Sequence, residues 1–154
     1  MGSSEEKSSL NGLVHGLHRA SQYADDLFAE VVDDNGLTAR QLVVLEIVAA
    51  DDKPSQTDIC ARSGIDRSTI ADMVRRLIKK GYLLRRRSRF DSRRYAVQLT
   101  DEGRKVLERA LPHARDVETR LTSALEPKQR QQFLASLQKI LASSAARGQR
   151  GKGD

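Results

Sequence analysis

The 154-residue chain has room for one domain, or for one domain with a flanking helical layer. Its single cysteine, Cys60, excludes an internal disulfide, and no apolar run approaches the roughly 20 residues of a membrane span. The net charge is +6, but residues 62–94 hold 12 Lys/Arg against 3 Asp/Glu, a concentration that favours nucleic acid over the rival partners, an acidic or a membrane surface.

The chain opens with a polar, acidic stretch, residues 1–9, that lacks the apolar core of a signal peptide. We therefore expect a flexible N-terminus on a soluble protein of the cytoplasm that makes no contact with membranes. Residues 10–32 then place apolar side chains three and four positions apart, which predicts a long amphipathic helix. The dipeptide "NG" at 35–36 ends this helix.

The segment "LTARQL" has the pattern of a helix start. Thr38 is expected to cap the helix, Gln41 to return the hydrogen bond, and Leu37 to pack against Leu42. The mostly apolar run "LVVLEIVAA" that follows predicts a central, buried helix, which "DDKP" ends.

Two capped helices come next and have the outline of a helix-turn-helix. Ser55 is expected to cap the first, which ends at Gly64, and Asp66 to cap the second, which ends at Gly81. The second helix turns a set of apolar residues inward: Ile70, Met73, Val74, Leu77 and Ile78.

The outer face of that second helix suits the major groove of DNA, where the first residues of a recognition helix usually reach the bases. The candidate contacts on this face are Arg67, Ser68, Thr69, Asp72, Arg75 and Arg76. Ser55 and Gln56 are candidates for phosphate contact, because free N–H groups at a helix start favour an anion. The alternative is that the basic residues are only a solvated helix face.

The stretch "LLRRRSRFDSRRYAVQLT" predicts a β-hairpin with its tip near residues 90–93, because Tyr95, Val97 and Leu99 alternate with more polar or smaller residues. Arginines on this hairpin could straddle a minor groove, the candidates being Arg87, Arg89 and Arg93. Asp91 is expected to pair with Arg93 and hold the tip in shape. The alternative is that this pair only prevents edge-to-edge association of strands.

The rest of the chain predicts two more helices. Thr100 is expected to cap the first, in which Pro112 could cause a kink, and Pro127 suits the first position of the second. Residues 144–154 are poor in apolar groups and are expected to be a disordered tail. Long terminal helices and only 4% aromatic residues indicate that a partner chain supplies part of the core. The predicted fold is mainly α with a small β-hairpin wing: a winged helix-turn-helix flanked by long dimerisation helices.

The segment "DSRRYAVQLTDEGR" resembles the wing motif of MarR-family regulators, in which D-x-R precedes an alternating strand and L-T-x-x-G. Further segments match that family's pattern in order and spacing: "LTARQLVVLEIV", "SQTDICARSGIDRSTIADMVRRLIKKGYLLR" and "LEPKQRQQFLASLQKI". By position, Asp91 and Arg93 match the family's wing pair. Arg94 departs from the pattern, which often has a small or acidic residue there.

The resemblance implies a homodimer in which residues 10–36 and 101–143 form the dimerisation region and residues 37–100 the winged helix-turn-helix. It also implies double-stranded DNA as a partner, bound at a pseudo-palindromic operator. Members of the family mostly repress transcription and release DNA when a small ligand enters a cleft beside the dimer helices. We expect that effector to be an aromatic acid or its thioester.

Three polar residues could orient such an acid: His18, Ser21 and Arg40. The alternative is that Arg40 is a surface residue and that His18 and Ser21 are satisfied groups of the dimer interface. Cys60 stands where the family pattern usually has alanine, so we interpret it as a small core residue. A redox-sensing repressor that uses Cys60 is the rival hypothesis.

The sequence has no motif that indicates an enzyme or a cofactor. It contains no phosphate-binding glycine loop, no H-E-x-x-H and no nucleophile elbow. A metal site is not expected, because His15, His18 and His113 are the only histidines and they form no cluster with the lone cysteine. A non-specific architectural DNA-binding protein remains an alternative. Such a protein would need only positive charge, and not the mixed Ser, Thr and Asp side chains that the face of the predicted recognition helix carries.

Overall fold

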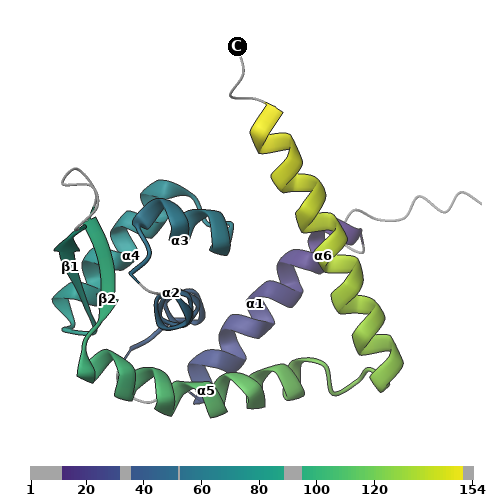
Figure 1. The fold of residues 1–154 in the computed structure, drawn as a ribbon. Coiled ribbons are helices and arrows are strands. Elements are labelled where there is room, and N and C mark those ends of the chain that lie inside the picture. Colours follow the sequence, from purple (N-terminus) through teal and green to yellow (C-terminus); the bar gives the residue numbers. More distant parts are fainter. Residues whose placement is uncertain (1–11, 32–35, 52, 89–94, 151–154) are drawn as a thin grey trace, which may run out of the picture.

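The computed structural model describes residues 12–31, 36–51, 53–88 and 95–150 (Figure 1). Its elements are, in chain order, α1 (Leu13–Val31), α2 (Ala39–Ala50), α3 (Gln56–Ser63), α4 (Arg67–Lys79), β1 (Leu83–Arg87), β2 (Tyr95–Leu99), α5 (Asp101–Leu121) and α6 (Pro127–Arg150). This order confirms the predicted fold class, a mainly helical chain with a β-hairpin wing. Among the described helices, none combines the length and apolar character that crossing a bilayer requires.

The helix starts form as the sequence predicts. The Gln41 N–H donates to Thr38 Oγ1 at 3.2 Å, and the Thr38 N–H donates to Gln41 Oε1 at 3.2 Å, which completes a capping box at α2. Gly64 ends α3 with a φ of +70°, a left-handed conformation that glycine adopts without steric cost. This turn sets α4 at an angle to α3 and so creates the helix-turn-helix.

The core is built around α2, which packs against α3, α4, α5 and β2. Val44 and Leu45 of α2 have no exposed surface, and neither do Ile59 of α3 and Ile70 of α4. Burying each such aliphatic side chain contributes about 1.5–3 kcal/mol, so this layer fixes where α4 lies. Figure 1 shows α2 end-on, inside the ring that the other core elements form around it.

The wing is an antiparallel pair in which Leu83 lies opposite Leu99 and Arg87 opposite Tyr95. Two details of the predicted alternation are wrong, since Ala96 is buried and Tyr95 is half exposed. The reason is a second neighbour of β2: Ser55 forms a bridge opposite Ala96 and covers it. The predicted tip near residues 90–93, with the Asp91–Arg93 pair, lies outside the described residues.

The junction between the wing and α5 is close-packed. Thr100 caps α5 by accepting a hydrogen bond from the Gly103 N–H at 2.9 Å, as predicted, and its own N–H donates to the Tyr82 carbonyl at 3.1 Å. A Cβ added at Gly103 would overlap the Tyr82 carbonyl group, with the carbonyl carbon at 2.8 Å. Only glycine therefore fits at this position.

The long terminal helices differ in how they are supported. α1 packs against α5, and Glu30 and Arg120 form an ion pair between them at 3.8 Å. α6 begins at Pro127, as predicted, and Figure 1 shows it rising from the far end of α5, apart from the winged core. It continues to Arg150, whereas the sequence indicates a disordered tail from residue 144. Alanines at 142, 145 and 146 have the highest helix propensity and allow a formed helix to continue.

Candidate nucleic-acid interface

The outward face of α4 carries the polar residues that the sequence predicts for DNA contact. Ile70, Val74 and Leu77 on the opposite face have no exposed surface and hold the helix against the core. Because these residues are three and four positions apart, they share one face with the partly buried Met73 and Ile78, and the opposite face of α4 is turned to solvent. The exposed or half-exposed candidates on this face are Arg67, Ser68, Thr69, Asp72, Arg75 and Arg76.

The start of α4 is organised by Asp66, its N-cap. One oxygen of the carboxylate accepts from the Ser68 hydroxyl at 2.7 Å and the Thr69 N–H at 2.9 Å, and the other accepts from the Thr69 hydroxyl at 2.6 Å. Hydrogen bonds from the Ser68 and Thr69 hydroxyls, and from the Thr69 N–H, hold the pKa of Asp66 well below its usual range. Asp66 is therefore ionised at neutral pH.

Asp72 lies one turn further along α4 and holds two arginines. It forms an ion pair with Arg75, and its Oδ2 accepts from Arg76 Nε at 2.7 Å. The hydrogen bond from Arg75, with the charge of Arg76, lowers the pKa of Asp72. The carboxylate predicted to contact a base is thus already bound, whereas Arg76, held through Nε, keeps its two terminal nitrogens available to a ligand.

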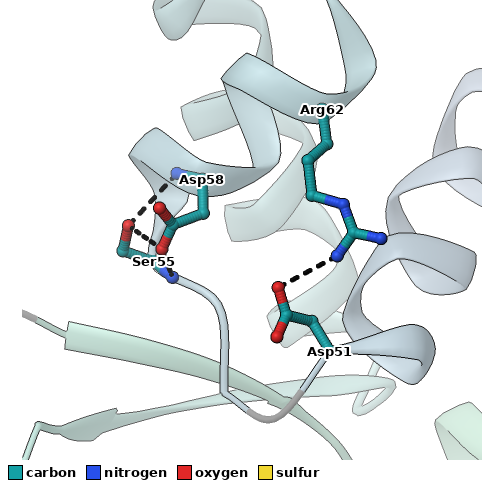
Figure 2. A network of polar contacts seen from close by, with 4 residues as sticks. All are labelled: Asp51, Ser55, Asp58 and Arg62. Carbon is teal, nitrogen blue, oxygen red and sulfur yellow. Dashed lines mark hydrogen bonds and ion pairs between the residues drawn. The ribbon is translucent and has the colours of Figure 1, made fainter.

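The start of α3 carries Ser55 and Gln56, the predicted phosphate contacts. Figure 2 shows Ser55 and Asp58 facing each other, and the Ser55 N–H and hydroxyl both donate to Asp58 Oδ2, at 2.8 and 2.6 Å. Asp58 therefore occupies part of the anion site that the helix start creates. At the other end of α3, Arg62 Nη1 donates to Asp51 at 2.9 Å and ties α3 to the end of α2.

The wing adds arginines from β1 next to the helix-turn-helix. β1 presents three exposed arginines: Arg85, Arg86 and Arg87. Arg85 Nη2 donates to Gln56 Oε1 at 2.6 Å, so the wing is fixed to the helix-turn-helix by a contact between residues 29 positions apart. The sequence interpretation missed the role of Arg85. The other predicted wing contacts, Arg89, Asp91 and Arg93, lie outside the described residues.

The three residues predicted to bind a small acid do not come together in one chain. Arg40 lines a cavity of about 320 Å³ between the end of α1 and the start of α2, together with Asp25, Phe28, Ala29, Leu37, Thr38 and Ala39. His18 and Ser21 are exposed on the preceding turns of α1 and do not line this cavity. The lining combines apolar side chains with two opposite charges, the guanidinium of Arg40 and the carboxylate of Asp25.

The described part of the chain also bears on metal binding and on the place of Cys60. No group of three His, Cys, Asp or Glu side chains there could hold a metal ion. Cys60, predicted to be a small buried core residue, packs against the hydrophobic core but is only half buried on α3.

A family model described as the MarR family matches residues 35–94. The transcriptional regulator HosA of Escherichia coli is 30% identical over 107 residues, which cover 68% of this chain and 78% of HosA. The transcriptional repressor CouR, solved bound to a 23-mer DNA duplex, is 33% identical with a TM-score of 0.77, covering 84% of this chain and 92% of CouR. BpsR of Bordetella bronchiseptica, whose DNA binding is regulated by 6-hydroxynicotinic acid, is 29% identical with a TM-score of 0.75. The match covers 82% of this chain and 96% of BpsR.

Proposed function

The chain belongs to the MarR family of transcriptional regulators, and on that premise we propose that it is a homodimeric repressor of a pseudo-palindromic operator, released by a small aromatic acid. The observation that carries the DNA-binding part is the outward face of α4. Buried Ile70, Val74 and Leu77 fix the helix, while hydroxyls and guanidinium groups occupy its exposed side. A recognition helix needs such a rigid support and such a mixed polar surface.

In the proposed complex, α4 enters the major groove and the arginines of β1 lie along the adjacent backbone or minor groove. The Arg85–Gln56 hydrogen bond would keep the wing and helix-turn-helix at a fixed distance on the duplex. Two copies would place their α4 helices about one helical turn of DNA apart, roughly 34–36 Å. CouR, which is similar over most of the chain, binds a DNA duplex and so supports this arrangement.

The test of this function is competition between genomic fragments for the purified protein, followed by footprinting of the fragment that binds best. A repressor of one operator should select a fragment with two related half-sites and bind it about 10³-fold or more above random DNA. Equal binding to all fragments would instead identify a non-specific architectural protein.

Arg76→Ala is expected to relax the base preference of the protein at one position of each half-site. The reason is that Arg76 keeps two terminal nitrogens available for a bidentate contact, which contributes about 1–3 kcal/mol of discrimination. Titrating the variant against operators substituted at every position measures this. Lys79→Ala, on the exposed last turn of α4, is the matched control and should weaken binding to all sequences equally. A uniform loss with Arg76→Ala would make Arg76 a phosphate contact.

The homodimer is supported by apolar surface that one chain leaves uncovered. Leu134 and Leu141 of α6 are 57% and 66% exposed, and Leu13 and Val14 of α1 are 75% and 67% exposed. Among the described elements, α6 packs extensively against no other. Exposed leucines at helical spacing on the first and last helices suit a second copy that covers both.

The proposed effector site is the cavity at the start of α2. Arg40 would bind the carboxylate of an aromatic acid, while Phe28 and Leu37 would contact its ring. Such a ligand releases DNA only if it prefers a dimer whose α4 helices no longer match successive major grooves. The regulation of BpsR by 6-hydroxynicotinic acid supports this class of effector. His18 and Ser21 could join the site only through a second subunit or a movement of α1.

Arg40→Ala is expected to weaken the release of operator DNA by an aromatic acid by about 10-fold or more, since a hydrogen bond to a charged group contributes about 1.5–3 kcal/mol. Operator affinity without the acid should stay unchanged. The measurement is an operator-binding titration against 6-hydroxynicotinic acid and a panel of phenolic acids. Arg40→Lys keeps the positive charge, so its response to the acid should be reduced less than that of Arg40→Ala.

Hydroperoxide should not release the operator, because Cys60 is packed against the core. Release by peroxide that disappears in Cys60→Ser, together with no response to any aromatic acid, would replace the ligand hypothesis with the redox one.

A further inference from the structure

The two hydroxyl protons at the start of α4 are already donated to the Asp66 carboxylate. Ser68 Oγ and Thr69 Oγ1 lie 2.7 and 2.6 Å from the two carboxylate oxygens of Asp66. An ionised carboxylate has no proton to give, so both hydroxyls must be the donors in these contacts. The same hydrogen bonds hold the pKa of Asp66 far below neutrality, which keeps the carboxylate ionised under all physiological conditions.

A hydroxyl group has one proton and two acceptor lone pairs. Once Ser68 and Thr69 have donated to Asp66, they can offer DNA only a hydrogen-bond acceptor. In the major groove the donors are the N4 amino group of cytosine and the N6 amino group of adenine, whereas guanine and thymine present acceptors. Phosphate oxygens are also acceptors, so these hydroxyls suit base reading and not backbone contact.

Resting on the DNA-binding function proposed above, we infer that Asp66 is a positioning residue that sets operator specificity: it fixes Ser68 and Thr69 as acceptors, so that the start of α4 selects a base with an exocyclic amino group, cytosine or adenine. Guanine O6 or thymine O4 at that place would face a hydroxyl oxygen without a proton between them.

The rest of the α4 face separates hydrogen-bond acceptors from hydrogen-bond donors along the helix. Asp72 lies between the helix start and Arg76, and its negative charge is balanced by ion pairs with Arg75 and Arg76. The face therefore presents acceptors at Ser68 and Thr69 and donors at Arg76, about two turns or 10 Å further along the helix. Each half-site should accordingly contain an amino-bearing base under the helix start and a guanine under Arg76.

The experiment uses the full-length protein and operator duplexes in which one exocyclic amino group at a time is removed. Each cytosine is replaced in turn by an analogue without the 4-amino group, and each adenine by purine, which lacks the 6-amino group. For the wild-type protein, one substitution per half-site should weaken binding about 10-fold, the effect of losing one hydrogen bond and leaving its partner unpaired. In Thr69→Val or Ser68→Ala, which lack the hydroxyl, that penalty should fall to about 2-fold or less.

Asp66→Asn tests the positioning role directly. Asparagine caps helices as well as aspartate, so the melting temperature should be almost unchanged. Its side-chain NH₂ can donate to one of the hydroxyls, which then has a proton for DNA. The variant should therefore lose the preference for the amino-bearing base. Its affinity for operators with thymine or guanine at that position should be within about 3-fold of its affinity for the original operator.

Two results would overturn the inference: no amino group in the operator that affects wild-type binding, or an Asp66→Asn protein that keeps the full penalty. Failure of the proposed function looks different, because the wild-type protein would then bind operator and scrambled DNA alike. The Thr69→Val and Ser68→Ala titrations leave the Asp66 carboxylate in place, and so decide the question even if Asp66→Asn folds poorly.

Discussion

Replacing Gly103 with alanine is expected to lower the free energy of unfolding by about 3 kcal/mol, at the upper end of the effects of overpacking. The added Cβ would lie 2.8 Å from the carbonyl carbon of Tyr82, and the obstacle is backbone, which cannot rotate aside as a side chain does. Relief requires moving Tyr82 away from Thr100, whose N–H donates to the Tyr82 carbonyl. Thermal unfolding followed by circular dichroism should show a melting temperature lower by about 6–12 °C.

Gly16→Ala is the matched control, because a Cβ there meets nothing within 4 Å. Gly16 lies inside α1, where alanine is favoured over glycine by about 0.5–1 kcal/mol, so this variant should melt at the same or a slightly higher temperature. Equal destabilisation by both substitutions would show that the loss comes from something other than the overlap with Tyr82.

The sequence predicts the parts of the interface that depend on local chemistry. Thr38, Ser55, Asp66 and Thr100 cap their helices as expected, because a cap is decided by side chains within three or four positions. The buried face of α4 follows from its spacing for the same reason. The binding of both arginines by Asp72 could also have been read from the sequence, since residues three and four positions apart on a helix are neighbours.

The contacts that set the wing in place are not local and leave no periodic signal. The bridge between Ser55 and Ala96 is a single pair, too short to show alternation, and its effect is that Ala96 is buried against the prediction. The bond between Gln56 and Arg85 joins two residues that each look like ordinary surface groups. The sequence indicates a basic hairpin beside a helix-turn-helix, but only the fold shows that one arginine of that hairpin fixes it to α3.

The proposed dimer also depends on features that a single chain leaves incomplete. Leu134 and Leu141 are seven positions apart and lie on the same side of α6, where each is more than half exposed. Changing both to glutamate places two charges in the surface that a second copy would cover, and burial of unpaired charge costs several kcal/mol per ion. The double variant is therefore expected to be monomeric in light scattering at micromolar concentration, whereas the wild-type protein should have the mass of a dimer.

The same variant should lose nearly all specific DNA binding, because a monomer holds one half-site. A dimer with a nanomolar Kd would keep about half of its binding free energy, which corresponds to an affinity loss of about 10⁴-fold. Ala135→Glu with Ala142→Glu is the matched control, since it adds the same charges, also seven positions apart, about 100° round α6 from the two leucines, where both alanines are exposed. This control should remain dimeric and lose little operator affinity. If the two double variants behave alike, added negative charge explains the loss, and the apolar face of α6 is not the surface that joins the subunits.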